Sequence, residues 1–323
     1  MTLYRALAVS IAVVVVATML GCGGSGNSLI YQNISERAAW SVANVLAFAS
    51  IGGNGQKYVY RSNKLGGGQF LLTKTKNTVT TDDEGGWNPA FSPDGSTVIF
   101  ASHRKAGSTG IYRMDATQGD VTNFAAITNI TADGQDVQPT WKHGGIQIAY
   151  ASNKVVGGGT GSLDIVIQNA DGTGARNYVI ATVADEQWPS FSPDDSQIAY
   201  QLGPIGGPTD IVIHNIGTGT DTNLTAPLRT GPGDTSRFEA PCWATVGTDQ
   251  WIYFHSNRDG DFDIYRIRPT GTDLQQITND ARSDGFPVIS PDGTRLLFTR
   301  DRELWSRDPA PGTVTETRVT RRY

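Results

Sequence analysis

Short apolar runs separated by turn-forming residues cover most of this chain, and they recur at a nearly fixed spacing. Typical runs are Val98–Phe100, Ile148–Tyr150 and Ile198–Tyr200. Runs this short, rich in β-branched and aromatic residues and bounded by Gly, Pro, Asp and Ser, indicate buried β-strands rather than helices. The pattern therefore predicts an all-β fold.

A proline in the strand before each apolar run sets the period of the repeat. These prolines are spaced by 50, 50, 52 and 46 residues, at Pro89, Pro139, Pro189, Pro241 and Pro287. A sixth unit lacks the proline but keeps Trp40 and the apolar run Val45–Ser50. Six copies thus cover residues 38 to 323, and a period of this length is typical of repeat architectures.

The rest of each copy is equally regular. A turn follows the proline strand, as in Ser92–Gly95, because Pro presets φ while Asp and Gly tolerate the turn conformation. A third run follows, as in Asp263–Tyr265. The fourth run is expected to end on a threonine, namely Thr73, Thr128, Thr182, Thr225, Thr278 or Thr320. Four strands in six copies predict a six-bladed β-propeller of four-stranded antiparallel blades, since radial stacking buries both faces of each small sheet.

These motifs carry a family resemblance. The Ser-Pro-Asp-Gly turn, Ser256–Gly260 and Asp263–Tyr265 resemble the WD-like (WD40-like) repeats of TolB-like propellers over nearly all of the chain after residue 37. The resemblance implies a protein of the cell envelope that faces the periplasm or the cell exterior. In the TolB protein that this family resemblance points to, an α/β domain stands ahead of the propeller. Only about 15 residues separate Cys22 from the first blade here, so we expect that domain to be missing and carry over no Tol-Pal role.

The first residues predict export and a lipid anchor. Arg5 precedes the apolar run Ala6–Leu20, which is too short to span a bilayer as a helix. Met19–Cys22 resembles the lipobox of bacterial lipoproteins, which implies lipidation of Cys22 and membrane attachment through it. An ordinary secretory signal with a chance cysteine is the alternative. We expect a lipoprotein signal peptide over residues 1–21, a flexible tether over 22–36 and the propeller over 37–323.

The composition limits the classes of partner that this protein is expected to bind. Lys and Arg number 26 against 31 Asp and Glu, with no basic stripe, which argues against nucleic acid. The chain has 38 glycines, as many tight turns require. If Cys22 is lipidated, Cys242 has no disulfide partner, and its apolar strand predicts a buried inert thiol. We expect a monomer.

Charged and aromatic residues recur just before the strand prolines, on the face where a propeller channel opens. The candidate binding residues are Trp87, Asp136, Glu186, Trp188, Arg237 and Asp284. Carboxylates with one arginine and aromatic platforms suit a peptide, a sugar or a cationic group. The alternative is structural: the acids bond to the backbone at strand starts and the aromatic rings wedge between blades. Repetition around the ring favours the structural interpretation for most of them.

No catalytic set is recognisable in the sequence. The run Asp259–Asp263 alternates acids as calcium loops do, but a strand follows where a further ligand is needed, so we predict no metal or cofactor. The four histidines fall at different points of the repeat. Gly-x-Ser-x-Gly elbows and phosphate-loop lysines are absent from the sequence. The long connection Ala226–Ser236 is expected to border the binding face.

These observations favour a non-enzymatic module of the cell envelope that binds a protein or a peptide. A metal-assisted lyase or lactonase acting on a sugar derivative is the alternative, and it needs Asp136, Glu186 and Asp284 to hold a metal. A purely structural protein of an envelope assembly is the third hypothesis. The sequence does not decide how the ring closes, because Leu29–Ile34 either adds an outer strand or belongs to the tether.

Overall fold

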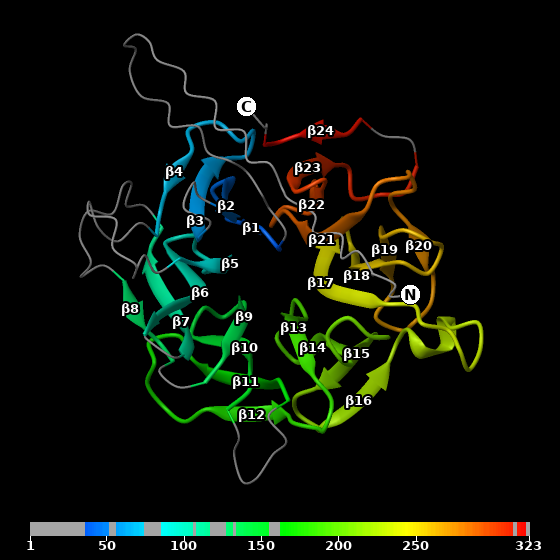
Figure 1. Cartoon of the computed structure of the whole chain (residues 1–323), viewed down its shortest axis with the longest axis horizontal. Helices are drawn as coiled ribbons and strands as arrows, with labels where there is room; N and C mark the ends of the chain where they lie inside the picture. Colours follow the sequence, from blue (N-terminus) through cyan, green and yellow to red (C-terminus); the bar gives the residue numbers. More distant parts are fainter. Residues whose placement is uncertain are drawn as a thin grey trace, which may run out of the picture.

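The computed structural model describes residues 36–51, 56–73, 85–105, 108–116, 127–131, 134–154, 162–312 and 315–320. Their strands form six four-stranded antiparallel sheets, each with its strands in chain order. Figure 1 shows these sheets arranged radially around a central axis, with the first strand of each sheet innermost. The predicted six-bladed β-propeller is therefore confirmed. The signal peptide, Cys22 and almost all of the tether lie outside the described residues.

Each blade contains four consecutive strands. Blade 1 contains β1 (Ala39–Trp40), β2 (Val45–Ile51), β3 (Lys57–Asn63) and β4 (Phe70–Leu71). Blade 2 contains β5 (Trp87–Phe91), β6 (Thr97–Lys105), β7 (Ser108–Asp115) and β8 (Thr128–Asn129). Blade 3 contains β9 (Asp136–Trp141), β10 (Gln147–Ser152), β11 (Asp164–Asn169) and β12 (Asn177–Ile180).

The second half of the ring follows the same plan. Blade 4 contains β13 (Glu186–Phe191), β14 (Gln197–Leu202), β15 (Asp210–Asn215) and β16 (Thr220–Asn223). Blade 5 contains β17 (Phe238–Val246), β18 (Asp249–Ser256), β19 (Asp263–Ile267) and β20 (Gln275–Gln276), and a short 3-10 helix, η2 (Ala226–Leu228), precedes it. Blade 6 contains β21 (Asp284–Ile289), β22 (Leu296–Arg300), β23 (Glu303–Arg307) and β24 (Thr317–Arg318).

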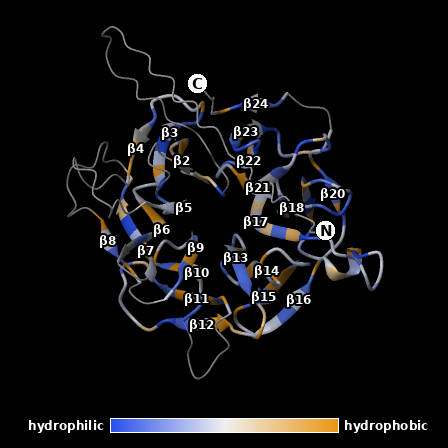
Figure 2. Cartoon of the chain, viewed as in Figure 1, coloured by the Kyte–Doolittle hydropathy of each residue, from blue (hydrophilic) through white to orange (hydrophobic). Residues whose placement is uncertain are grey.

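The core lies between the blades rather than within them. Six apolar clusters of described residues occupy the six interfaces between neighbouring blades. Between blades 4 and 5, for example, Ile211 packs with Phe238 and Phe254. Figure 2 shows the corresponding hydrophobic stretches within the strands. The second and third runs of each repeat are buried because each blade covers the face of the next.

The ring closes by side-chain packing between the first and last blades. Trp40 and Phe48 of blade 1 share a cluster with Leu297, Leu304 and Val319 of blade 6. Blade 6 takes its fourth strand, β24, from the C-terminal end of the chain. Within the described residues, no blade therefore combines strands from both ends of the chain. Leu29–Ile34, proposed above as an extra strand or tether, lies outside the described residues.

The Ser-Pro-Asp turns reverse the chain after the inner strand, as predicted. In blade 2, Ser92 Oγ donates to Asp94 Oδ1 at 2.6 Å, and the Thr97 N–H donates back to Ser92 Oγ at 3.0 Å. The same bonds recur around Asp194 and Asp292. These hydrogen bonds hold the pKa of all three aspartates below the ordinary value.

The strand prolines belong to a bulge that repeats in five inner strands. The residue before each proline has φ between 48° and 57°, and the pairing with the second strand shifts register there. Such a bulge bends the strand and re-aims one side chain, at a conformational cost for residues other than glycine. These residues are Asn88, Gln138, Trp188, Ala240 and Phe286.

The repeated threonines fasten the outer strand to the third. Thr225 Oγ1 accepts the Ile211 N–H at 2.9 Å and donates to Asp210 Oδ1 at 3.0 Å. Equivalent bonds to the third strand are made by Thr73, Thr131, Thr278 and Thr320. In blade 2 the sequence-based choice of Thr128 is wrong: Thr128 is exposed at the start of β8, and Thr131 makes the bond.

Candidate functional site

The bulges place one residue of each blade at the same level of the central channel. In blade 1 the equivalent position, two residues before β1, is held by Arg37. The full set is Arg37, Asn88, Gln138, Trp188, Ala240 and Phe286. Ala240 is fully buried and small, which leaves room for larger neighbours.

Three of these side chains meet across the channel and form a neck. The Trp188 ring lies 5.2 Å from the Phe286 ring, although a whole blade separates them in the sequence. The Arg37 guanidinium stands 5.2 Å above the Trp188 ring and donates to the Pro241 carbonyl. Contacts between a guanidinium and an indole are favourable cation–π interactions.

Next to the neck, blade 5 contributes a buried Glu–His pair. His255 Nε2 lies 3.2 Å from Glu239 Oε2, and Arg237 Nη2 lies 2.7 Å from Glu239 Oε1. His255 Nδ1 accepts the Phe286 N–H at 3.3 Å, one of the backbone groups released by the bulge. His255 therefore needs a proton on Nε2 and none on Nδ1, which is the neutral form.

The pKa shifts agree with this arrangement. Burial lowers the pKa of His255, although the hydrogen bond to Glu239 opposes the effect. Burial by itself raises the pKa of Glu239, but the His255 hydrogen bond and the Arg237 charge outweigh it and leave the pKa below its ordinary value. Glu239 is thus an anion held by Arg237 and a neutral imidazole.

Aromatic rings complete this surface. The His255 ring lies 5.0 Å from Phe286 and 5.2 Å from Phe262, and the Arg237 guanidinium stands 5.2 Å from the Phe262 ring. We call the set Arg37, Trp188, Arg237, Glu239, His255, Phe262 and Phe286 the mouth cluster. Trp188, Phe286, Phe262 and Arg237 are only half-buried. The mouth cluster therefore presents aromatic faces and a guanidinium that a ligand can reach.

A cavity of about 410 Å³ lies beyond the neck, between the second halves of the inner strands. Its described lining is mostly apolar and includes Ala90, Pro139 and Cys242, with Arg37 at the neck. Burial raises the pKa of the Cys242 thiol. The predicted buried thiol is thus found inside the channel, where part of its surface faces the cavity.

The predicted acids at the inner-strand starts lie in separate blades, and two of them pair with an arginine of their own blade. Asp136 is buried against Arg176 at 2.9 Å, and burial raises its pKa despite that cation. Asp284 is buried against Arg300, and burial again raises its pKa. Among the described residues, no three His, Cys, Asp or Glu side chains are placed to share a metal ion. The three acids of the lyase hypothesis are therefore not brought together.

Glu186 differs from the other two acids. Its Oε1 accepts a hydrogen bond from Thr182, while Oε2 is buried without a partner among the described residues. Burial raises the pKa of Glu186 to about 7, and the charges of Asp164 and Asp185 add to the effect. Glu186 can therefore gain or lose a proton near neutral pH.

The remaining predicted positions lie elsewhere on the ring. Trp87 packs on His103 in blade 2, with 4.6 Å between ring centroids. The connection Ala226–Ser236 is held by Arg229, which bonds to Asp210 and to the carbonyls of Thr209 and Ser236. In the acidic run Asp259–Asp263, Asp259 accepts from the Tyr265 hydroxyl and Asp263 accepts from Thr278.

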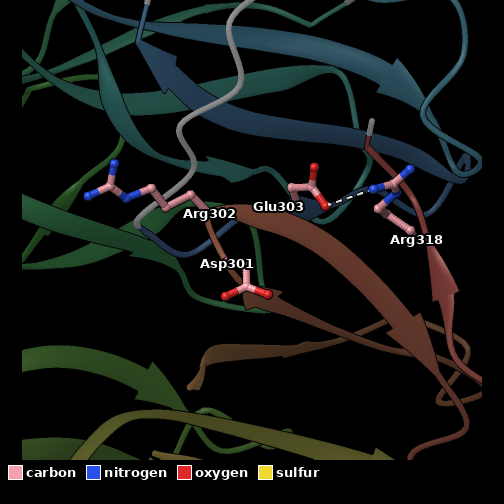
Figure 3. Close-up of a pocket in the computed structure, with 4 residues that line it drawn as sticks. All are labelled: Asp301, Arg302, Glu303 and Arg318. Atoms are coloured by element: carbon pink, nitrogen blue, oxygen red, sulfur yellow. Dashed lines mark hydrogen bonds and ion pairs between the residues drawn. The ribbon is translucent and has the colours of Figure 1, made fainter. Parts of the chain in front are cut away.

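A second hollow lies at the β22–β23 hairpin. Four charged side chains line it, and Figure 3 shows Glu303 directed at Arg318 while Asp301 and Arg302 point away from that pair. Arg318 Nη1 lies 3.4 Å from Glu303 Oε2. The opposite charges of this hollow are divided between one ion pair and two diverging side chains, so they do not form a convergent site.

Sequence reasoning chose Trp188 and Arg237 of the mouth cluster as candidate binding residues but not its other five members, Arg37, Glu239, His255, Phe262 and Phe286. Arg37 sits in the one repeat without a proline, Phe262 lies in a loop, and His255 ends a second strand. When the six repeats are aligned on their inner strands, Arg37 falls at the position that precedes the proline in the other five repeats. This alignment is a usable sequence signal for Arg37. No sequence signal links His255 to Glu239, because only the register of β17 with β18 makes them neighbours.

The geometry defines this protein as a propeller with a partly closed central channel. No protein-family model matches the chain. An uncharacterized protein of Agrobacterium fabrum is 28% identical over 65% of this chain and 64% of its own length. A TolB homologue of Chlorobium luteolum is 28% identical over 68% of this chain and 43% of its own length. The chain thus spans less than two thirds of either relative.

Solved structures share the fold. A TolB structure from Agrobacterium tumefaciens matches with a TM-score of 0.58 and 22% identity, over 71% of this chain and 79% of its own. A gluconolactonase from Xanthomonas campestris matches with a TM-score of 0.58 and 15% identity, over 86% and 87%. This chain is therefore a six-bladed β-propeller that is similar in sequence to a TolB homologue and shares its fold with a solved structure of this kind. Across the part of the chain that the structure describes, no helix has the length and apolar character needed to cross a bilayer.

Proposed function

We propose that this protein is a non-enzymatic binding module of the cell envelope, and that its mouth cluster takes up a segment of a protein or peptide partner. The supporting observation is the half-buried group of Trp188, Phe286 and Arg237 at one end of the channel. Aromatic and arginine side chains dominate the binding energy of protein interfaces. In the mouth cluster, intramolecular contacts already hold them in place, which lowers the entropic cost of binding.

The chemistry of the mouth cluster supports binding rather than acid–base catalysis. Both ring nitrogens of His255 are engaged, one by Glu239 and one by the Phe286 backbone. A general base needs a free lone pair within reach of a substrate proton. Arg237 instead offers donors beside the Phe262 face, an arrangement that suits a carboxylate or a backbone carbonyl of a partner.

The anchor is part of the same proposal. Lipidation of Cys22 holds the propeller at a membrane surface, where a partner in the envelope is within reach of the short tether. Metabolic labelling with a radioactive fatty acid should mark the wild-type protein and fail to mark Cys22→Ser. Equal labelling of both proteins would exclude Cys22 as the lipidated residue.

Affinity capture from envelope extract tests the partner. The wild type should retain a protein or peptide that the double variant Trp188→Ala with Arg237→Ala loses, because that variant removes one aromatic anchor and one guanidinium. The control variant carries Arg295→Ala and Ile146→Ala, two exposed residues outside the mouth cluster. It should retain the partner.

The outcomes separate the hypotheses. Loss of the partner in both variants, or in neither, would contradict the proposed role of the mouth cluster. Absence of any specific partner, combined with a stoichiometric metal in the purified protein, would favour the lyase or lactonase alternative. Circular dichroism of each variant confirms that the compared proteins are folded.

A further inference from the structure

The cavity beyond the neck is lined by a half-buried arginine, Arg37, for which no ion pair is found among the described residues. Arg37 donates to the Pro241 carbonyl, and its Nε is buried with no partner among the described residues. Burial lowers the pKa of Arg37, and the ionisable groups recorded near it are the Cys242 thiol and the His255 imidazole, neither of which is an anion. Glu36, its sequence neighbour, is directed instead at Lys57 and Asn88.

An unpaired guanidinium in such a place is costly. Removing a charge from water carries a penalty of several kcal/mol unless an opposite charge or enough hydrogen-bond partners replace the water. The Trp188 face and one carbonyl supply part of that compensation. The remaining N–H groups of Arg37 can still donate hydrogen bonds to both oxygens of a carboxylate.

The walls of the cavity restrict which anion fits. Apart from Arg37, its described lining has one other basic side chain, His143, which is exposed and bonded to Asp195 at 2.9 Å. The remaining lining contains prolines, alanines, aromatic rings, small hydroxyl side chains and the Cys242 thiol. A multiply charged ion would lose its hydration here and meet a single cation. A monoanion with an apolar body loses less hydration, and burial of its apolar part is favourable.

We propose that this cavity binds an organic monocarboxylate with an apolar body, whose carboxylate pairs with Arg37. The cavity volume of about 410 Å³ suits an acid of small-ligand size. A free acid and the carboxyl terminus of a peptide with an apolar last residue share this chemistry. The inference goes beyond the proposed partner binding, since the cavity lies on the other side of the neck from Arg237.

Calorimetric titration of the intact chain in detergent tests the proposal. The probes are octanoate, its neutral analogue octanamide, and a short peptide ending in phenylalanine with a free or an amidated carboxyl terminus. Octanoate should bind at least about tenfold more tightly than octanamide, because one charge-assisted bidentate bond contributes about that much. Preference for the free-carboxyl peptide over octanoate would identify a peptide terminus as the source.

Variants locate the site. Arg37→Gln should abolish the difference between octanoate and octanamide. Thr140→Leu, which narrows the cavity without touching the cation, should weaken both ligands. The matched control is Arg61→Gln, because Arg61 is also half-buried and bonded to a backbone carbonyl, that of Ala116, outside the cavity. Arg61→Gln should leave octanoate binding unchanged. Octanoate binding is measured on the purified protein and partner capture on envelope extract, so failure of partner capture and failure of this inference are distinguishable.

Several results would overturn the proposal. Equal affinity of the wild type for octanoate and octanamide would show that Arg37 acts only as a structural contact. Absence of binding by every probe would show that the cavity binds no such acid. An unchanged preference for octanoate in Arg37→Gln would show that Arg37 does not hold the carboxylate. If Arg37→Gln does not fold, the acid-to-amide comparison in the wild type and Thr140→Leu decides the question without it.

Discussion

At the scale of single residues, Glu186 shows how one position of the repeat can change its chemistry. Asp136 and Asp284 start their inner strands beside an arginine, whereas the recorded side-chain partner of Glu186 is Thr182. Burial raises the pKa of Glu186 to about 7. The folded protein therefore keeps this proton more tightly than the unfolded chain, in which the pKa of the glutamate has its ordinary value of 4.5.

This difference predicts a pH-dependent stability. Because the folded-state pKa is raised, the free energy of unfolding should fall as pH rises from 4.5 through about 7. Glu186→Gln should increase the free energy of unfolding by about 1–3 kcal/mol near about pH 8.5 and change it little near about pH 5. Urea unfolding followed by circular dichroism at the two pH values measures this effect.

Glu239 provides the matched control, since it is also a buried glutamate in an inner strand. Its pKa is lowered by His255 and Arg237, so its ionised form stabilises the fold. Glu239→Gln should therefore lower the free energy of unfolding at neutral pH, the opposite sign from Glu186→Gln. If Glu186→Gln gives the same stability change at both pH values, the buried carboxylate is not the titrating group.

At the scale of single elements, several outer strands depend on side-chain hydrogen bonds in addition to their backbone pairing. β4, β8, β20 and β24 contain only two residues each. Strands this short contribute few backbone bonds, and the threonine beyond each strand adds a side-chain bond to the buried third strand. This side-chain hydrogen bond explains why a threonine recurs near the end of the repeats.

Thr225→Val tests this side-chain hydrogen bond. The substitution keeps the shape of the side chain but removes the side-chain acceptor of the Ile211 N–H and one of the hydrogen-bond donors to Asp210. We expect the free energy of unfolding to fall by about 1–3 kcal/mol. Thr218→Val, at an exposed position of the β15–β16 turn, should change it by less than about 0.5 kcal/mol. Equal effects in thermal or urea unfolding would contradict the proposed fastening.

At the scale of the whole molecule, the seam between blades 1 and 6 joins the first and last blades of the ring, which are not consecutive in the sequence. Trp40 and Phe48 contact Leu297 across it. Every other interface is bridged by the chain as well as by its apolar cluster. Local opening of the ring should therefore begin at this seam, where packing alone resists it.

Leu297→Ala and Leu296→Ala form a matched pair for this expectation. The two residues are adjacent in β22 and both buried, but Leu297 faces the seam while Leu296 faces blade 5. Each substitution should cost about 2–5 kcal/mol of stability. Only Leu297→Ala should accelerate hydrogen exchange selectively in blade 1, measured by mass spectrometry. Equal acceleration by both would show that the seam is no weaker than other interfaces.

Much of the architecture could be predicted from the sequence because the repeat encodes local rules. Proline before the inner strand, Ser-Pro-Asp turns and short apolar runs each act within a few residues, and six copies multiply the signal. The threonine of blade 2 was misplaced by three residues because local spacing there does not reveal which hydroxyl reaches β7. The positive φ before each proline was also not visible, since the sequence shows a proline but no bulge.

The sequence by itself determined the fold class, the number of blades and the place of the turns, because these follow from propensity and periodicity along the chain. Tertiary structure alone decided which side chains meet in the channel. Arg37, Trp188 and Phe286 come from blades 1, 4 and 6, and ring closure is what joins them. The position of Arg37 is likewise a property of the closed ring. This half-buried arginine has no ion-pair partner among the described residues, and the apolar cavity that it lines exists only when all blades are in place.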